Sequence, residues 1–163
     1  MEITTELVKE LRDKTGVSVM QCKKALEETG GDIEKATALL LEKSAEIASK
    51  KSDRSLGAGF ISTYVHATGN VGVMLELLCE TDFVAKNDEF KALARDIAMH
   101  VTATNPKFLK PEDVTNPEEG EALLSQAFIK NPEVTIKNLL ESATQKFGEK
   151  IELSRFVRYS ISE

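Results

Sequence analysis

The spacing of hydrophobic residues changes near residue 50, and this change limits the folds that the chain can adopt. Up to residue 48, apolar side chains recur every three or four positions, as on one face of an α-helix. Between Val71 and Cys79 they alternate with other residues, as in a β-strand with one buried face. The intervening segment 50–55 is polar and has no apolar period. We therefore predict an α+β chain of 163 residues with two domains, residues 1–54 and 55–163.

The first domain is predicted to be a three-helix bundle within residues 4–48. Gly16 and Gly30 are typical of helix ends, because glycine adopts the left-handed turn that closes a helix. Ser18 is expected to begin the second helix and Asp32 the third, since their side-chain oxygens can accept hydrogen bonds from the first free amides. Helices this short predict a small bundle with a thin core.

The second domain is predicted to hold a three-stranded antiparallel sheet packed against helices. Two strands flank a glycine-containing hairpin at 67–70, and a strand near the C-terminus is expected to join them. Helices beginning at Asn87 and Thr135 are expected to pack on one face of this sheet. Residues 104–121 contain prolines and acidic clusters and are predicted to form a surface connection. The predicted strands are residues 60–66, 71–79 and 151–161.

The composition favours a protein partner over nucleic acid or a membrane. Lys and Arg number 21 against 27 Asp and Glu, a net charge of −6, whereas binding to phosphate backbones needs a clustered positive surface. No stretch approaches the roughly 20 apolar residues of a membrane span. The N-terminus runs directly into an acidic amphipathic helix without a targeting pattern, so we expect a reducing cytoplasm as the compartment.

No arrangement of residues predicts catalytic chemistry, a cofactor or a metal site. Cys22 and Cys79 are far apart and lack zinc-type spacing, and Cys79 falls on the buried face of its strand. His100 lies at the edge of the apolar stripe of its helix, which favours a core position. One alternative is a small hydrolase that pairs Cys22 or Cys79 with a histidine, and thiol reactivity would test it. We expect a binding protein that is not an enzyme.

Two places carry apolar side chains that the periodic patterns leave unassigned. Phe83 follows the second strand and precedes the next helix, so it either forms an exposed wedge or folds back onto the sheet. Val19 and Met20 either fill the bundle core or present a hydrophobic patch, and spacing alone favours the core. Arg12 and Lys23 are close enough in the chain to border such a patch, although charged residues usually form a solvated face.

His66 is placed by the alternation of side chains along the first strand. It shares one face with Ser62 and Tyr64, while Ile61 and Val65 occupy the other. We therefore predict that His66 faces solvent or a partner. A plain exposed histidine fits the same spacing equally well.

Several motifs along nearly the whole chain occur together in one known family. The most specific is Thr81-Asp82-Phe83-Val84-Ala85-Lys86-Asn87. Residues 7–12, 22–26 and 31–33 supply further motifs near the N-terminus, and residues 155–158 supply one near the other end. On these residues the chain resembles the family of elongation factor Ts, the guanine-nucleotide exchange factors of the GTPase EF-Tu. The order of several independent motifs makes coincidence a poor explanation.

The resemblance implies a fold, a partner and a set of contact residues. The N-terminal bundle would be similar to ubiquitin-associated domains and would dock on the nucleotide domain of EF-Tu. The Asp82-Phe83 pair would be pushed into that domain near its magnesium site, which promotes GDP release without covalent chemistry. His66 and Gly148 would also touch the GTPase. The residues implied to contact EF-Tu are Thr81, Asp82, Phe83, Val84, Arg12, Val19, Met20, Lys23, His66 and Gly148.

The chain departs from longer family members in two ways. It has one hairpin and one closing strand, so it resembles the short, single-core type, which acts as a homodimer in a 2:2 complex with EF-Tu. In such a dimer one protomer supplies the Asp-Phe pair and the other supplies the histidine-bearing face. The family usually inserts a projecting coiled coil between positions matching Glu112 and Ile129, where this chain has a short connection.

An adaptor is the main alternative to an exchange factor. A bundle with a Gly16-Val17 loop could capture ubiquitin or a similar protein. That hypothesis leaves the Asp82-Phe83 motif and the whole second domain unexplained. Added GDP separates the two, because an exchange factor loses affinity for EF-Tu as GDP is added and an adaptor is indifferent to nucleotide.

Overall fold

The structure, a computed structural model, describes residues 2–162 and contains two compact units. The first unit is formed by the chain up to Asp53 together with residues 138–150. The second is formed by residues 54–137 together with the chain from Ile151 onward. The mixed helix and sheet content confirms the α+β class. No helix within the described range is long and apolar enough to cross a membrane.

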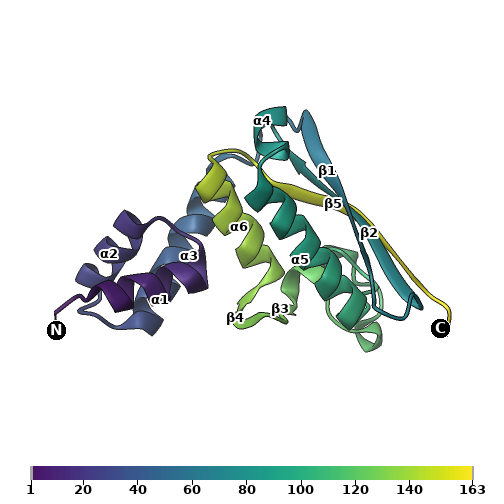
Figure 1. The fold of residues 1–163 in the computed structure, drawn as a ribbon, viewed down its shortest axis with the longest axis horizontal. Coiled ribbons are helices and arrows are strands. Elements are labelled where there is room, and N and C mark those ends of the chain that lie inside the picture. The colour runs from purple at the N-terminus through teal and green to yellow at the C-terminus, as the bar shows by residue number, and fades with distance from the viewer. Residues whose placement is uncertain (1, 163) are drawn as a thin grey trace. The chain divides into compact units, whose positions relative to one another are not determined.

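The first unit contains three helices in the predicted order, α1 (Thr5–Thr15), α2 (Val19–Glu28) and α3 (Ile33–Lys50) (Figure 1). Ser18 and Asp32 cap α2 and α3 by accepting hydrogen bonds from backbone amides, as predicted. Gly16 ends α1 with φ of 69°, a conformation that costs glycine nothing. The helix α3 continues to residue 50, beyond the predicted end. The core residues are Val8, Leu11, Val17, Cys22, Ala25, Leu26, Ala36 and Leu40.

A fourth helix, α6 (Ile136–Phe147), differs from the prediction, because from Asn138 onward it belongs to the first unit rather than to the sheet. Polar side chains near its end link this helix to α2 and α3. Ser44, fully buried on α3, donates to Oε1 of Gln145. The Nε2 of Gln145 donates to Oε1 of Gln21 on α2 at 3.0 Å. The amphipathic pattern of α6 predicts a buried face but does not predict which surface buries it.

The second unit is built on a three-stranded antiparallel sheet of β1 (Ala58–Val65), β2 (Val71–Cys79) and β5 (Glu152–Ser160). The sheet has three antiparallel strands, as predicted, and their order is β1-β2-β5, with β2 in the centre. The helix α5 (Asp88–Thr104) packs on β1 and β2 (Figure 1). Alternate residues of β2 from Val73 to Cys79 are buried, as predicted.

The segment between α5 and α6 has more structure than the sequence suggested. It contains short 3-10 turns and a hairpin of β3 (Ala127–Phe128) and β4 (Asn131–Thr135). The hairpin was not predicted, because a two-residue strand and a strand that contains Pro132 show no alternation. The turns are Pro111–Asp113, Pro117–Glu119 and Leu123–Ser125.

The fully buried His100 holds this hairpin against α5. The backbone N–H of Ile129 donates to Nδ1 of His100 at 3.2 Å, so Nδ1 carries no proton. The other nitrogen, Nε2, therefore donates to Oε1 of Gln126 at 2.8 Å. Thr104 donates to the same oxygen. A protonated imidazole would place an N–H of His100 against the N–H of Ile129, so the fold requires the neutral ring.

We predict that protonation of His100 in the unfolded state makes the protein less stable as the pH falls. Burial lowers the pKa of His100 in the folded state, while an unfolded histidine titrates near 6.5. The unfolded state then gains a proton that the folded state does not, so stability is lost as the pH falls below about 6.5. We expect urea unfolding to show a lower stability at about pH 5.5 than at about pH 7.5. The His100→Gln variant, less stable at both pH values, should lack that part of the slope; an equal slope would contradict the assignment.

Candidate protein-interaction site

The corner between β2 and α5 is fixed at both ends by side-chain caps. A single helical turn, α4 (Asp82–Ala85), occupies it. The hydroxyl oxygen of Thr81 accepts a hydrogen bond from the N–H of Val84 at 3.4 Å. The amide oxygen of Asn87 accepts one from the N–H of Glu89 at 2.8 Å and so begins α5. The corner is therefore a short rigid element rather than a free loop.

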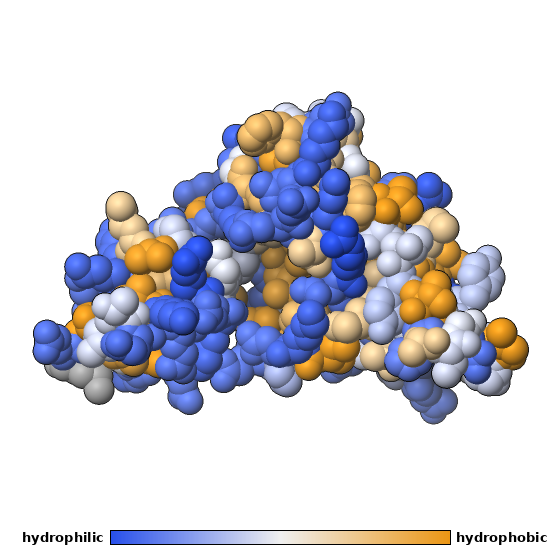
Figure 2. All heavy atoms as spheres, in the orientation of Figure 1, coloured by the Kyte–Doolittle hydropathy of each residue, from blue (hydrophilic) through white to orange (hydrophobic). Residues whose placement is uncertain are grey.

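The side chains of α4 divide sharply between core and surface. Val84 and Ala85 are buried and anchor the turn. Phe83 is 86% exposed, and Asp82 beside it is exposed as well. Figure 2 shows hydrophobic atoms reaching the surface over α4, at the top of the view. Of the two alternatives left open by the sequence, the exposed aromatic wedge is the one that the structure contains.

Of the residues predicted to contact the partner, Val84 is the one whose side chain is buried. Its exposed fraction is 4%, so its side chain lies in the core. The sequence placed it among the contact residues because the motif does not reveal where the corner turns inward. Its contribution to the site is to hold the turn in place.

The predicted contact residues of the bundle lie around the turn from α1 to α2. Met20 is 81% exposed and Val19 is also exposed, so the preference for core positions was wrong. Val17 fills the core instead, because the chain turns at Gly16 before α2 begins. Figure 2 shows hydrophobic atoms at the surface over α2. Two exposed cations border this patch, Arg12 and Lys23.

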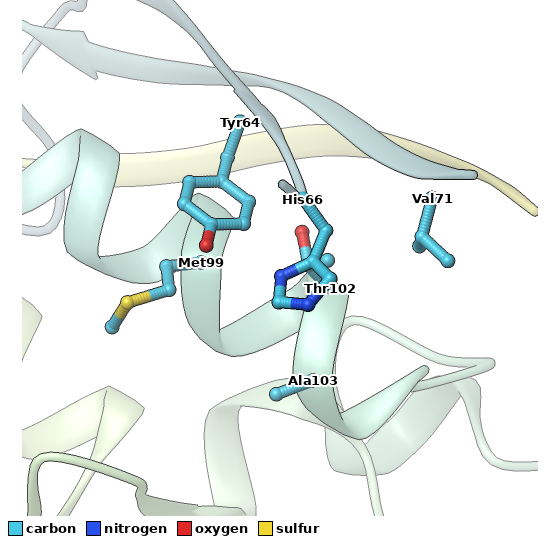
Figure 3. Close-up of a pocket in the computed structure, with 6 residues that line it drawn as sticks. All are labelled: Tyr64, His66, Val71, Met99, Thr102 and Ala103. Atoms are coloured by element: carbon cyan, nitrogen blue, oxygen red, sulfur yellow. The ribbon is translucent and has the colours of Figure 1, made fainter. Parts of the chain in front are cut away.

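His66 lies at the end of β1, where it borders a pocket of about 330 Å³ beside α5. Its ring lies near that of Tyr64, with centroids 6.4 Å apart, and both side chains project toward α5 (Figure 3). His66 is exposed, as predicted. The pocket is lined by Tyr64, His66, Val71, Met99, Thr102 and Ala103.

The two faces of β1 are the reverse of the predicted ones. Ser62, expected to face outward with His66, is buried under α5. Ile61 is about half exposed, and Val65 is 63% exposed on the opposite face. The sequence could not decide between these faces, because β1 carries apolar or aromatic residues on both. The exposed position of His66 results from its place beyond the last paired residue of the strand.

The outer face of the sheet is an apolar surface that the sequence analysis did not identify. Met74 on the central strand is 50% exposed and pairs with Val157 on β5. An ion pair between Glu76 and Arg155 at 3.2 Å lies on the same face. Alternation along β5 offered a signal, since Val157 and Tyr159 share one face. We define the outer sheet face as Ile61, Val65, Met74, Val157 and Tyr159.

The predicted contact residues are divided between the two units. Arg12, Val19, Met20, Lys23 and Gly148 belong to the first unit, and the rest belong to the second. Gly148 is exposed and adopts φ of 71° at the end of α6.

Within the second unit, the corner and His66 lie at opposite ends of β2. At the start of β2, the N–H of His66 donates to the carbonyl of Val71. At the end of β2, the corner follows Cys79. A strand of nine residues spans roughly 27 Å. One chain therefore does not bring Phe83 and His66 together.

The buried thiols offer no site for nucleophilic catalysis. Cys22 and Cys79 are both fully buried. Desolvation raises the pKa of Cys22, which is unfavourable for a reactive thiolate. The thiol of Cys79 donates to the carbonyl of Thr81 at 3.3 Å. Within residues 2–162 no group of three or more His, Cys, Asp or Glu side chains is arranged to hold a metal ion.

Comparison with known proteins identifies a family. A family model described as "Elongation factor TS" matches residues 1–119. Proteins named elongation factor Ts from Carboxydothermus hydrogenoformans and Thermodesulfovibrio yellowstonii are 41% and 42% identical, over 99% and 100% of this chain and 90% and 98% of their own. The protein of that name from Desulfotalea psychrophila is 41% identical over 99% of each chain.

The alignments also report a difference in length. They run over 195 or 196 positions, whereas this chain has 163 residues, so these relatives carry internal residues that it lacks. The family model and the near-complete alignments agree with the motif at the corner and with the bundle before it. The chain belongs to the elongation factor Ts family.

Proposed function

We propose that this translation elongation factor is a guanine-nucleotide exchange factor that binds EF-Tu·GDP and promotes release of GDP. The observation that carries the proposal is Phe83, an 86% exposed aromatic ring on a capped turn beside the Asp82 carboxylate. A ring held in this way supplies contact area at little cost in conformational entropy. A carboxylate beside it can disturb a magnesium and phosphate site, where the metal charge dominates the local field.

Exchange of this kind needs binding energy and no covalent chemistry. If the chain binds nucleotide-free EF-Tu more tightly than EF-Tu·GDP, linkage requires that it weaken GDP binding by the same factor. The absence of a catalytic arrangement among the described residues fits this mechanism. The protein is then a binding partner of a GTPase rather than an enzyme, with no cofactor of its own, acting in the cytoplasm where translation takes place.

The proposal assigns a role to each domain. Residues 1–54 would form a bundle similar to ubiquitin-associated domains that docks on EF-Tu through the exposed Val19-Met20 patch, bordered by Arg12 and Lys23. Residues 55–163 would form the core domain that carries the wedge. Thr81, His66 and Gly148 would complete the contact.

The proposal also includes a homodimer in a 2:2 complex with EF-Tu. Its support is that Phe83 and His66 lie at opposite ends of β2, so a contact surface shorter than the strand could hold both only if they came from two chains. A second copy of this chain fits the outer sheet face, since five apolar side chains lie there on three adjacent strands. The Glu76–Arg155 pair beside them gives that face both signs of charge, which suits contact with a copy of itself.

Competition with GDP tests the proposed function directly. The measurement is the affinity of the full chain for EF-Tu as GDP is added at constant magnesium. We expect the apparent affinity to fall steadily with GDP concentration. An affinity that does not respond to GDP would overturn the proposal and support the adaptor hypothesis.

A further inference from the structure

The segment that connects the two units ends against the base of the wedge. It runs from residue 51 to 57, between α3 and β1. The backbone carbonyl of Ser52 accepts a hydrogen bond from Nζ of Lys150 at 2.8 Å, within the first unit. Within the second unit, the guanidinium of Arg54 lies 3.5 Å from a carboxylate oxygen of Glu80. Asp53 is the one residue between these two attachments.

Glu80 is the residue that immediately precedes the cap of α4. Its side chain is 18% exposed, so much of it is enclosed, whereas that of Arg54 is about half exposed. A Cβ atom added at Gly57 would lie 3.3 Å from the backbone carbonyl oxygen of Glu80, so the connecting segment passes directly against that peptide. The residues on either side of Glu80 are also linked, because the Cys79 thiol donates to the carbonyl of Thr81.

These contacts hold the peptide from which the wedge projects. Thr81 caps α4 from an extended backbone conformation, and the peptide that joins it to Glu80 is part of that conformation. The direction of Phe83 depends on that cap and on the buried Val84. Arg54 supplies one long-range tie in this arrangement, since it lies 26 positions before Glu80 in the chain.

We propose that Arg54 is a positioning residue for nucleotide exchange, which fixes the base of the wedge through Glu80 and touches no reacting group itself. The inference rests on the proposed function. The Arg54 side of the pair is about half exposed, and an ion pair open to solvent usually contributes little to stability. Loss of the Arg54–Glu80 pair should therefore leave the fold unchanged. It should alter the direction of Phe83 and so lower the rate of GDP release from the complex once EF-Tu is saturated.

The test compares GDP release from EF-Tu, over a range of protein concentrations, for the full-length native chain and a set of variants. These are Arg54→Ala, Glu80→Gln, the double variant, and the charge-swapped pair Arg54→Glu with Glu80→Arg. Lys130→Ala is the matched control, because it removes a lysine that pairs with Asp96 at 2.7 Å elsewhere in the same unit. Urea unfolding of every variant reports stability separately.

We expect each single variant to lower the saturating release rate about threefold, a size within the range of an ion pair with one partner open to solvent. The double variant should lose no more than a single one, because the two residues act together. The swapped pair should recover at least half of the native rate. The half-saturating concentration, the unfolding midpoints and the Lys130→Ala rate should stay close to native values.

Three results would overturn the inference: single variants with native rates, losses that add in the double variant, or losses that follow the unfolding midpoint. Its failure is distinguishable from failure of the proposed function. If the native chain accelerates release and the variants match it, only the role of Arg54 falls. If the native chain does not accelerate release at all, both fall.

Discussion

Replacing Phe83 by alanine is expected to remove most of the exchange activity while the fold stays intact. The ring is 86% exposed, so its loss creates no cavity and should change the unfolding free energy by less than about 0.5 kcal/mol. At the centre of an interface, an aromatic side chain of this kind typically contributes 2 kcal/mol or more. We therefore expect GDP release to slow by at least about tenfold at equal protein concentration.

A matched control separates the wedge from a general loss of apolar surface. Ile129 is also exposed and lies in the same unit, on the turn between β3 and β4. Ile129→Ala should keep a release rate near the native one. Two results would contradict the wedge hypothesis: native activity of Phe83→Ala, or a large loss of stability that placed the ring in the core.

Placing a carboxylate on the outer sheet face is expected to give the second-largest effect. Met74→Glu adds a charge at a half-exposed position of the central strand, which the folded chain can solvate. A second copy seated on that face would have to bury the charge, which is costly without a partner. We expect self-association to weaken at least about tenfold.

Analytical ultracentrifugation with and without EF-Tu would measure this effect, and release rates would follow it. Ala92→Glu is the control, since it adds the same charge at an exposed position of α5 away from the outer sheet face. Met74→Glu should also slow GDP release. In the proposed dimer, one chain supplies Phe83 and the other supplies His66, since these residues lie at opposite ends of β2 within one chain. A variant that associates like the native chain would exclude this face as the dimer interface.

The fold was predictable where the hydrophobic pattern of a segment allowed only one buried face. The alternation from Val71 to Cys79 and the helical stripe of α5 both specified a buried face, and the caps Ser18, Asp32 and Asn87 marked where helices begin. The hairpin of β3 and β4 was not predictable in this way. It is stabilised by His100, which contacts Gln126 and Ile129, respectively 26 and 29 positions further along the chain.

Other errors arose where the residues allowed two packings of similar quality. Both faces of β1 carry apolar side chains, so only the position of α5 decides that Ser62 is buried and Val65 exposed. Val17 and Val19 are equally apolar, and after the turn at Gly16 Val17 is buried while Val19 is exposed. The helix α6 contacts α2 and α3 through the side-chain amide of Gln145, a polar link that no hydrophobic pattern reveals.

The candidate site was predictable in composition and less so in geometry. The motif from Thr81 to Asn87 marked the corner, but spacing left the direction of Phe83 open and did not show that Val84 points inward. The role of Arg54 depends on a contact across 26 residues, so local sequence carries no sign of it.

The most direct test of the account is the release rate of a fluorescent GDP from EF-Tu as a function of added protein. The account predicts a rate that rises with concentration and then saturates, because release occurs within the complex of the two proteins. A rate that stays at its intrinsic value while binding is saturated would contradict the account, because the chain would then bind EF-Tu without promoting exchange.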